Sequence, residues 1–126
     1  MGFLDRLKAS QSTKQEGWEV LSDISQLKKI DELSKEKPVI LFKHSTTCGI
    51  SASAKHRIEM DWSGLEGDFA FYYLDLLRMR PISSAIAKRY GVRHESPQIL
   101  VIRNGKATYH TSHHGIQISS INKAIA

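Results

Sequence analysis

A run of four apolar residues, Val39-Ile40-Leu41-Phe42, places the strongest constraint on how this 126-residue chain can fold. The run lacks the alternation of apolar and polar residues that marks a strand with one face in water. It therefore predicts a central β-strand whose two faces are both covered, as in α/β proteins. A chain of this length fits one compact domain and leaves little room for a second.

Strand-like and helix-like segments alternate on either side of this run. Strands are expected at residues 18–21, 39–42, 69–74, 99–102 and 107–110, and helices between Asp23 and Pro38 and at 52–60, 82–90 and 118–125. Ile24, Leu27, Ile30 and Leu33 should share the buried face of the first helix. Asn104-Gly105 between the last two strands predicts a tight hairpin. The order predicts an α/β fold with a central mixed β-sheet flanked by helices, parallel at first and antiparallel at the hairpin.

The N-terminal residues differ in composition from the rest. The polar stretch from Ser10 to Gly17 predicts a flexible N-terminal arm over residues 1–17, followed by a domain over 18–126. The longest apolar run is too short to cross a bilayer, and the first residues lack a secretory signal. We therefore expect a cytoplasmic protein that has no membrane partner and acts as a monomer.

The net charge of +5 comes from 18 basic and 13 acidic residues. The basic residues are scattered and do not alternate with aromatic residues, so we expect no nucleic-acid partner. The excess of positive charge instead favours attraction of small anionic ligands.

Cys48 is the single cysteine, so the chain cannot form an internal disulfide. It follows the predicted buried strand through a short polar turn and stands where a helix should begin. A helix N-terminus has unpaired N–H groups and a partial positive charge, which both favour a thiolate. Ser51, three residues on, can donate a hydrogen bond to that thiolate, and Thr47 and Gly49 are small enough to keep the sulfur accessible. Nearby positive charge should come from Lys43, His44, Lys55, His56 and Arg57.

Several separate motifs carry a resemblance to a known family. Cys48-Gly49-Ile50-Ser51 is a Cys-x-x-Ser motif, and the segment from Ile86 to Gly105 resembles the second half of thioredoxins. Together with His94-Glu95-Ser96-Pro97-Gln98 and the histidine-rich stretch from Tyr109 to His113, the chain resembles the YtxJ-type bacilliredoxin-like family over residues 18–125. This family has a thioredoxin-like fold and is linked to the low-molecular-weight thiol bacillithiol.

The resemblance implies a monothiol thiol–disulfide oxidoreductase that removes bacillithiol from S-bacillithiolated client proteins. Cys48 would be the nucleophile, Ser51 would stabilise its thiolate, and bacillithiol would be a co-substrate, with no other cofactor. Pro97 would follow a cis peptide bond beside Cys48, as in the wider fold. Ser96 and Gln98 would offer backbone groups to the ligand, and His113 would contact the anionic thiol compound.

Two alternatives stay open. Family members often carry proline where this chain has Gly49, and Cys-Gly-x-Ser is close to the motif of monothiol glutaredoxins that carry iron–sulfur clusters. An iron–sulfur carrier is therefore one alternative, although the glutaredoxin Gly-Gly motif is missing. A non-catalytic thioredoxin-like adaptor is the other. His110, His113 and His114 lack a partnering carboxylate in the sequence, so we expect no metal site.

Overall fold

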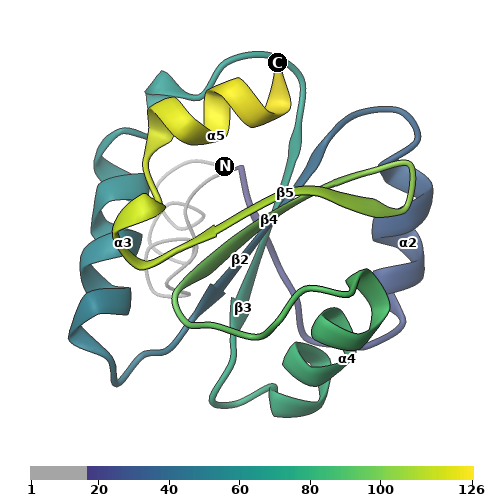
Figure 1. Ribbon diagram of the computed structural model, residues 1–126, viewed down its shortest axis with the longest axis horizontal. Coiled ribbons are helices and arrows are strands. Elements are labelled where there is room, and N and C mark those ends of the chain that lie inside the picture. Colours follow the sequence, from purple (N-terminus) through teal and green to yellow (C-terminus); the bar gives the residue numbers. More distant parts are fainter. Residues whose placement is uncertain (1–16) are drawn as a thin grey trace, which may run out of the picture.

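The computed structural model describes residues 17–126 as a five-stranded mixed sheet between two layers of helices (Figure 1). The strands are β1 (Glu19–Val20), β2 (Val39–His44), β3 (Ala70–Asp75), β4 (Gln98–Arg103) and β5 (Lys106–Ser112). The helices are α2 (Gln26–Leu33), α3 (Gly49–Met60), α4 (Arg80–Tyr90) and α5 (Ile118–Ile125), with the 3-10 turns η1 (Trp62–Gly64) and η2 (His113–Gly115). Apart from Gly17, the predicted arm lies outside the described residues. Within residues 17–126, no helix is long and apolar enough to cross a bilayer.

The strand order is β1-β3-β2-β4-β5, with β2 in the centre. β1 and β2 both run parallel to β3, whereas β4 is antiparallel to β2 and β5 is antiparallel to β4. All six residues of β2 are buried. The predicted central strand and the mixed sheet are therefore confirmed, and β2 extends two residues further than expected, through Lys43 and His44.

Each face of the sheet has its own core. Helices α3 and α5 cover one face and α2 and α4 cover the other (Figure 1). Because side chains alternate along a strand, β2 supplies both cores. The first core includes Ile40, Phe42, Ile58 and Ile121, and the second includes Val39, Leu41, Ile30 and Ile86.

The start of α2 differs from the prediction. The helix begins at Gln26, and Ile24 is 54% exposed, so its predicted place on the buried face was wrong. The Gln26 side chain accepts hydrogen bonds from the backbone N–H groups of Ser22 and Asp23, each at 2.8 Å. These bonds hold the preceding residues in a turn, and Ile24 lies in that turn rather than on the helix.

The predicted hairpin is confirmed, and α4 ends at the predicted residue, Tyr90. Gly91 ends α4 in the left-handed conformation, with φ of 66°. Asn104 and Gly105 also have positive φ, 51° and 74°, as a two-residue turn between antiparallel strands requires.

One edge of the sheet gathers three chain connections. Lys43 pairs with Gln98 and His44 pairs with Asp75, so β2 and β3 end where β4 begins. The turn that leads to Cys48, the loop before α4 and the segment that enters β4 all lie at this edge. We call it the Cys48 edge, and the Asn104–Gly105 hairpin lies at the opposite edge.

Lys43 is a charged side chain enclosed in the interior. It is 0% exposed, and its Nζ has no hydrogen-bond partner among the described residues. Alternation along β2 places it on the face that α2 and α4 cover. Burial lowers the pKa of Lys43 to about 8. Lys43 was expected to supply positive charge near the thiol, and the structure places that charge in the interior, on the face of the sheet that α2 and α4 cover.

We expect Lys43→Met to raise the free energy of unfolding by about 1–3 kcal/mol near pH 7, because it removes an unpaired ammonium group from the interior. Below pH 8 both the folded and unfolded states carry the proton, and the folded state bears the full cost. The gain should shrink between the folded pKa of about 8 and the ordinary value of 10.5. Urea unfolding near pH 7 and near pH 10.5 would measure this gain in stability. Lys29→Met, at an exposed position, is the control. A less stable Lys43→Met protein near pH 7 would contradict this prediction.

Candidate active site

A tight turn connects β2 to α3 and presents the only thiol of the chain. The N–H of Cys48 donates to the carbonyl of Ser45 at 3.2 Å, which closes the turn over Ser45–Cys48. Cys48 is the N-cap of α3, with extended backbone angles, and its side chain is partly exposed. The sulfur is therefore accessible to a partner molecule from solvent at this edge of the sheet.

The first turn of α3 surrounds this thiol with unpaired donors. The first intrahelical bond runs from Ala52 N–H to the carbonyl of Cys48, at 2.9 Å. The N–H groups of Gly49, Ile50 and Ser51 consequently have no partner within the helix. No acidic residue lies in this turn. The backbone thus supplies partial positive charge where a thiolate would form.

Ser51 connects α3 to the end of β2. Its Oγ lies 2.8 Å from Nδ1 of His44 and accepts a hydrogen bond from the Ser45 N–H at 2.9 Å, and the side chain is buried. A hydroxyl has one proton and two acceptor lone pairs. If His44 donates from Nδ1, both lone pairs are occupied and the hydroxyl proton is free for another acceptor. Donation to the Cys48 thiolate stays a prediction.

His44 is an uncharged neighbour rather than a source of positive charge. Its ring packs against Phe42 and Tyr73, with centroid distances of 5.9 Å and 5.7 Å, and it is 4% exposed. Burial, followed by the charge of Lys55, lowers the pKa of His44. The expected positive charge from His44 is therefore absent at neutral pH, and the neutral ring instead orients Ser51.

The segment that enters β4 contains the predicted ligand-binding residues Ser96, Pro97 and Gln98. The Ser96–Pro97 peptide bond is cis, and the Pro97 carbonyl accepts a hydrogen bond from His113 N–H at 3.1 Å. Gln98 is buried, and its Nε2 donates to the Arg93 carbonyl at 2.9 Å. Ser96 Oγ and Gln98 Oε1 are buried without a partner among the described residues.

His113 lies beside this segment in an unusual backbone conformation. Its φ is +52°, which is uncommon for a residue other than glycine. Arg57 of α3 donates to the His113 carbonyl at 3.2 Å, and Nδ1 of His113 lies 3.6 Å from Glu95. Glu95 also accepts a 2.6 Å hydrogen bond from Ser112. Arg57 therefore fastens α3 to η2, a role that its position in the sequence does not reveal.

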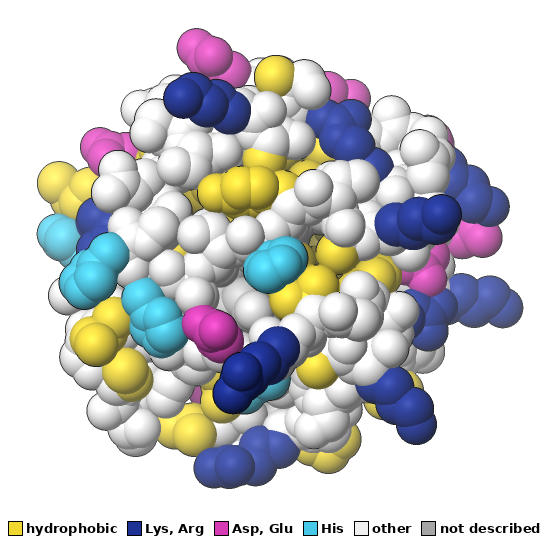
Figure 2. All heavy atoms as spheres, viewed as in Figure 1, with side chains coloured by type: hydrophobic (Ala, Val, Ile, Leu, Met, Phe, Trp, Pro, Cys, Tyr) yellow, Lys and Arg dark blue, Asp and Glu magenta, His cyan; other side chains and the backbone are white. Residues whose placement is uncertain are grey.

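Histidines gather on the side of the molecule where α3 and η2 lie (Figure 2). His56, His110 and His114 are exposed and His113 is half-buried. Among the described residues, no group of three His, Cys, Asp or Glu side chains could hold a metal ion. Their exposure leaves them available for contact with an anionic ligand.

Thr47 and Gly49 flank the thiol and are both exposed. Gly49 is the first residue of α3, and a Cβ built there would meet no atom within 4 Å. The first helical position also accommodates proline well. The Gly49 position therefore has no steric need for glycine, and proline would fit there.

Solved structures with the same architecture define the class of this protein. One is a protein with a thioredoxin fold, described as a candidate oxidoreductase, which is 35% identical with a TM-score of 0.73 over 87% of this chain and 95% of that chain. The thioredoxin of Fasciola hepatica is 18% identical, with a TM-score of 0.63 over 84% and 94% of the two chains. The thioredoxin of Malassezia sympodialis is 22% identical, with a TM-score of 0.63 over 86% and 87%. The protein is a thioredoxin-fold protein with one cysteine at the start of α3.

The family is more specific than the fold. Residues 19–121 match the family described as "Monothiol bacilliredoxin BrxC". The chain belongs to this monothiol bacilliredoxin family, which confirms the predicted family and supports redox activity in general.

We expect Ser51→Ala to lower the free energy of unfolding by about 1–3 kcal/mol, because the buried Ser45 N–H and His44 Nδ1 both lose their partner. Ser53→Ala on the exposed side of the same helix is the matched control and should change stability by less than about 0.5 kcal/mol. Urea denaturation of the two variants would measure the difference. Equal effects would show that the Ser51 contacts contribute nothing specific.

The lowered pKa of His44 predicts a loss of stability in acid. Below the ordinary pKa of 6.5, His44 takes up a proton in the unfolded chain but resists protonation in the folded protein. The free energy of unfolding therefore decreases as the pH is lowered. His94, whose pKa is lowered by burial and by Lys43, adds to the same trend. An NMR titration should give a midpoint below 6.5 for the His44 ring. A midpoint at or above that value would refute the burial argument.

Proposed function

We propose that this chain is a monothiol thiol–disulfide oxidoreductase that removes bacillithiol from protein mixed disulfides through Cys48. One observation carries the proposal. The only sulfur nucleophile of a monothiol bacilliredoxin family member is partly exposed at the N-terminus of α3. The co-substrate would be bacillithiol itself, and the partners would be S-bacillithiolated client proteins.

The reaction consists of two thiol–disulfide exchanges. The Cys48 thiolate attacks the bacillithiol sulfur of the client mixed disulfide, a new sulfur–sulfur bond forms, and the client leaves as a thiolate that takes up a proton. Because the sequence has no second cysteine, bacillithiol stays on Cys48. A second low-molecular-weight thiol, as its thiolate, then attacks the bacillithiol sulfur. This step yields a small disulfide and restores the Cys48 thiolate.

Each group around Cys48 has a part in this proposal. The free N–H groups of the first α3 turn stabilise the thiolate both as nucleophile and as leaving group. Thr47 and Gly49, which are exposed, leave room for the incoming disulfide. Backbone groups at Ser96 and Gln98, on either side of Pro97, would position the ligand. Ile50, 48% exposed, gives the client an apolar contact next to the sulfur.

The decisive experiment presents the enzyme with a client protein that carries bacillithiol on a cysteine. Wild-type protein should remove the adduct, and mass spectrometry should find bacillithiol on Cys48 after a single turnover. Cys48→Ser should remove nothing, because no other residue supplies a thiol. A glutathione adduct of the same client should be turned over more slowly. Equal rates for the bacillithiol and glutathione adducts would rule out a preference for bacillithiol, but the assignment as a thiol–disulfide oxidoreductase would stand.

A relocated thiol provides the matched control. The double variant Cys48→Ser with Ser53→Cys keeps one cysteine on an exposed part of α3 but moves it away from the helix N-terminus. We expect transfer at least about tenfold slower, because the new thiol lacks the stabilising N–H groups. An unreactive wild-type Cys48 would support an adaptor instead. A brown protein after anaerobic expression, with a colour that Cys48→Ser abolishes, would support an iron–sulfur carrier.

A further inference from the structure

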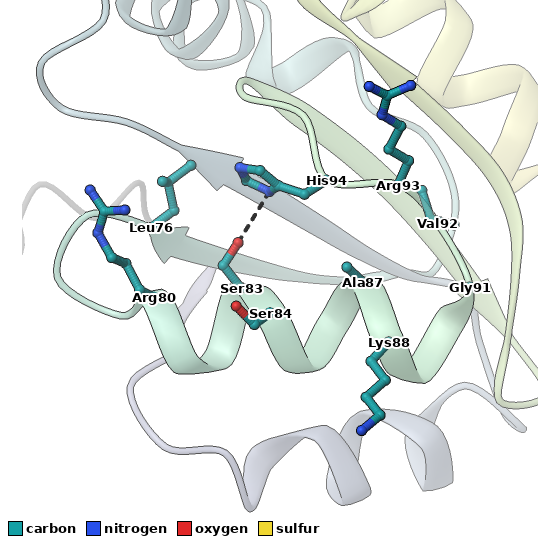
Figure 3. A pocket seen from close by; sticks show the side chains of 10 residues that line it. All are labelled: Leu76, Arg80, Ser83, Ser84, Ala87, Lys88, Gly91, Val92, Arg93 and His94. Atoms are coloured by element: carbon teal, nitrogen blue, oxygen red, sulfur yellow. Dashed lines mark hydrogen bonds between the residues drawn. The ribbon is translucent and has the colours of Figure 1, made fainter.

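A second concave site lies beside α4, outside the turn that holds Cys48. It is an open groove with a volume of about 600 Å³, lined by α4 and by the segment that leads from α4 toward Pro97 (Figure 3). Ligand pockets in proteins commonly measure about 300–1,000 Å³. The pocket is therefore large enough for a small molecule or for one group of a larger ligand.

The charges around this pocket are all of one sign. Arg80, Lys88 and Arg93 line it, and no carboxylate does. None of the three forms an ion pair with an acidic residue among the described part of the chain. Other basic side chains, such as Lys55 and Arg89, do have acidic partners. The pocket is thus a concentration of unpaired positive charge.

Hydrogen-bonding groups complete the lining. His94 Nδ1 lies 3.2 Å from the Ser83 hydroxyl, and Ser84 of the same helix also lines the pocket (Figure 3). Lys43 lies close enough to the His94 ring for its charge to lower the pKa of His94. Lys43 Nζ is buried and has no hydrogen-bond partner within residues 17–126, so a further cation without a described partner lies near His94.

One end of the pocket lies near the Cys48 edge. Arg80 is the first residue of α4, which begins at that edge, and His94 lies three residues before Pro97. The start of β4 pairs with Lys43, five residues before Cys48. A ligand whose sulfur reaches Cys48 therefore has a positively charged pocket on the α4 side of the same edge.

We propose that this pocket binds the malate group of the bacillithiol molecule whose sulfur is exchanged at Cys48. This inference rests on the function proposed above. Malate carries two carboxylates, and an arginine can hold a carboxylate with paired N–H donors, a geometry that lysine cannot reproduce. Arg80 and Arg93 line the two ends of the pocket (Figure 3). Lys88, Ser83 and Ser84 supply further donors. Glutathione lacks a malate group, so the pocket also contributes to the choice of thiol.

Direct binding is tested with free malate. In an NMR titration of the full chain, we expect saturable shifts of the backbone N–H signals of Arg93 and His94. The uncharged diamide of malate should produce none. The double variant Arg80→Gln with Arg93→Gln should bind malate at least about tenfold more weakly. This variant keeps the Arg93 backbone carbonyl, which accepts a hydrogen bond from Gln98 Nε2. Lys106→Gln, at the opposite edge, should bind like wild type. Shifts that are absent from the pocket, or equal weakening by Lys106→Gln, would overturn the inference.

Kinetics separate this inference from the proposed function. With a bacillithiolated client, the double variant should show a KM raised at least about tenfold, while its reaction with the uncharged hydroxyethyl disulfide stays unchanged. If wild type transfers bacillithiol and the double variant does so with the same KM, the pocket assignment fails and the function stands. If wild type transfers no bacillithiol to Cys48, the function fails and the malate assignment falls with it.

Discussion

β2 pairs along its length with β3 on one side and along all but its last residue with β4 on the other, and helices cover both of its faces. This complete burial fixes the place where the strand can end, because a buried strand cannot shift its register without exposing its apolar side chains. The Ser45–Cys48 turn follows at once, and Ser51 fastens the next helix to it. The position of the thiol is therefore set by the packing of the whole sheet.

The sequence was informative wherever a feature depends on neighbouring residues. The apolar run of β2, the Gly91 helix stop and the Asn104–Gly105 hairpin are all local signals, and the structure contains each of them. The position of the thiol at the start of α3 was also predictable, because a short polar turn after a buried strand indicates that a helix begins there. Ile24 was misassigned because the spacing of apolar residues alone placed it on the helix. Hydrogen bonds from the Ser22 and Asp23 N–H groups to the Gln26 side chain instead hold it in the turn before the helix.

The polar contacts of the site depend on residues that are distant in the chain, and no sequence pattern announces them. Arg57 holds the His113 carbonyl from 56 residues away. The sequence shows Lys43 only as a positive charge close to Cys48, and its burial arises because β2 extends far enough to enclose it between the sheet and the helices. The pocket beside α4 likewise exists only because the chain returns along that helix toward Pro97. Such features come from the tertiary fold, so only the structure reveals them.

The opposite edge of the sheet has a practical consequence for engineering. Arg103, next to the hairpin, donates to the carbonyls of Ile125 and Ala126 at 2.7 Å and 3.0 Å, which fixes the C-terminal end of α5 there. Figure 1 places that end across the molecule from the end of β2. A fluorescent reporter joined at Ala126 would therefore leave the thiol and the basic pocket open to solvent. The C-terminal end of α5 is thus a suitable attachment point for a reporter that must not cover the Cys48 edge.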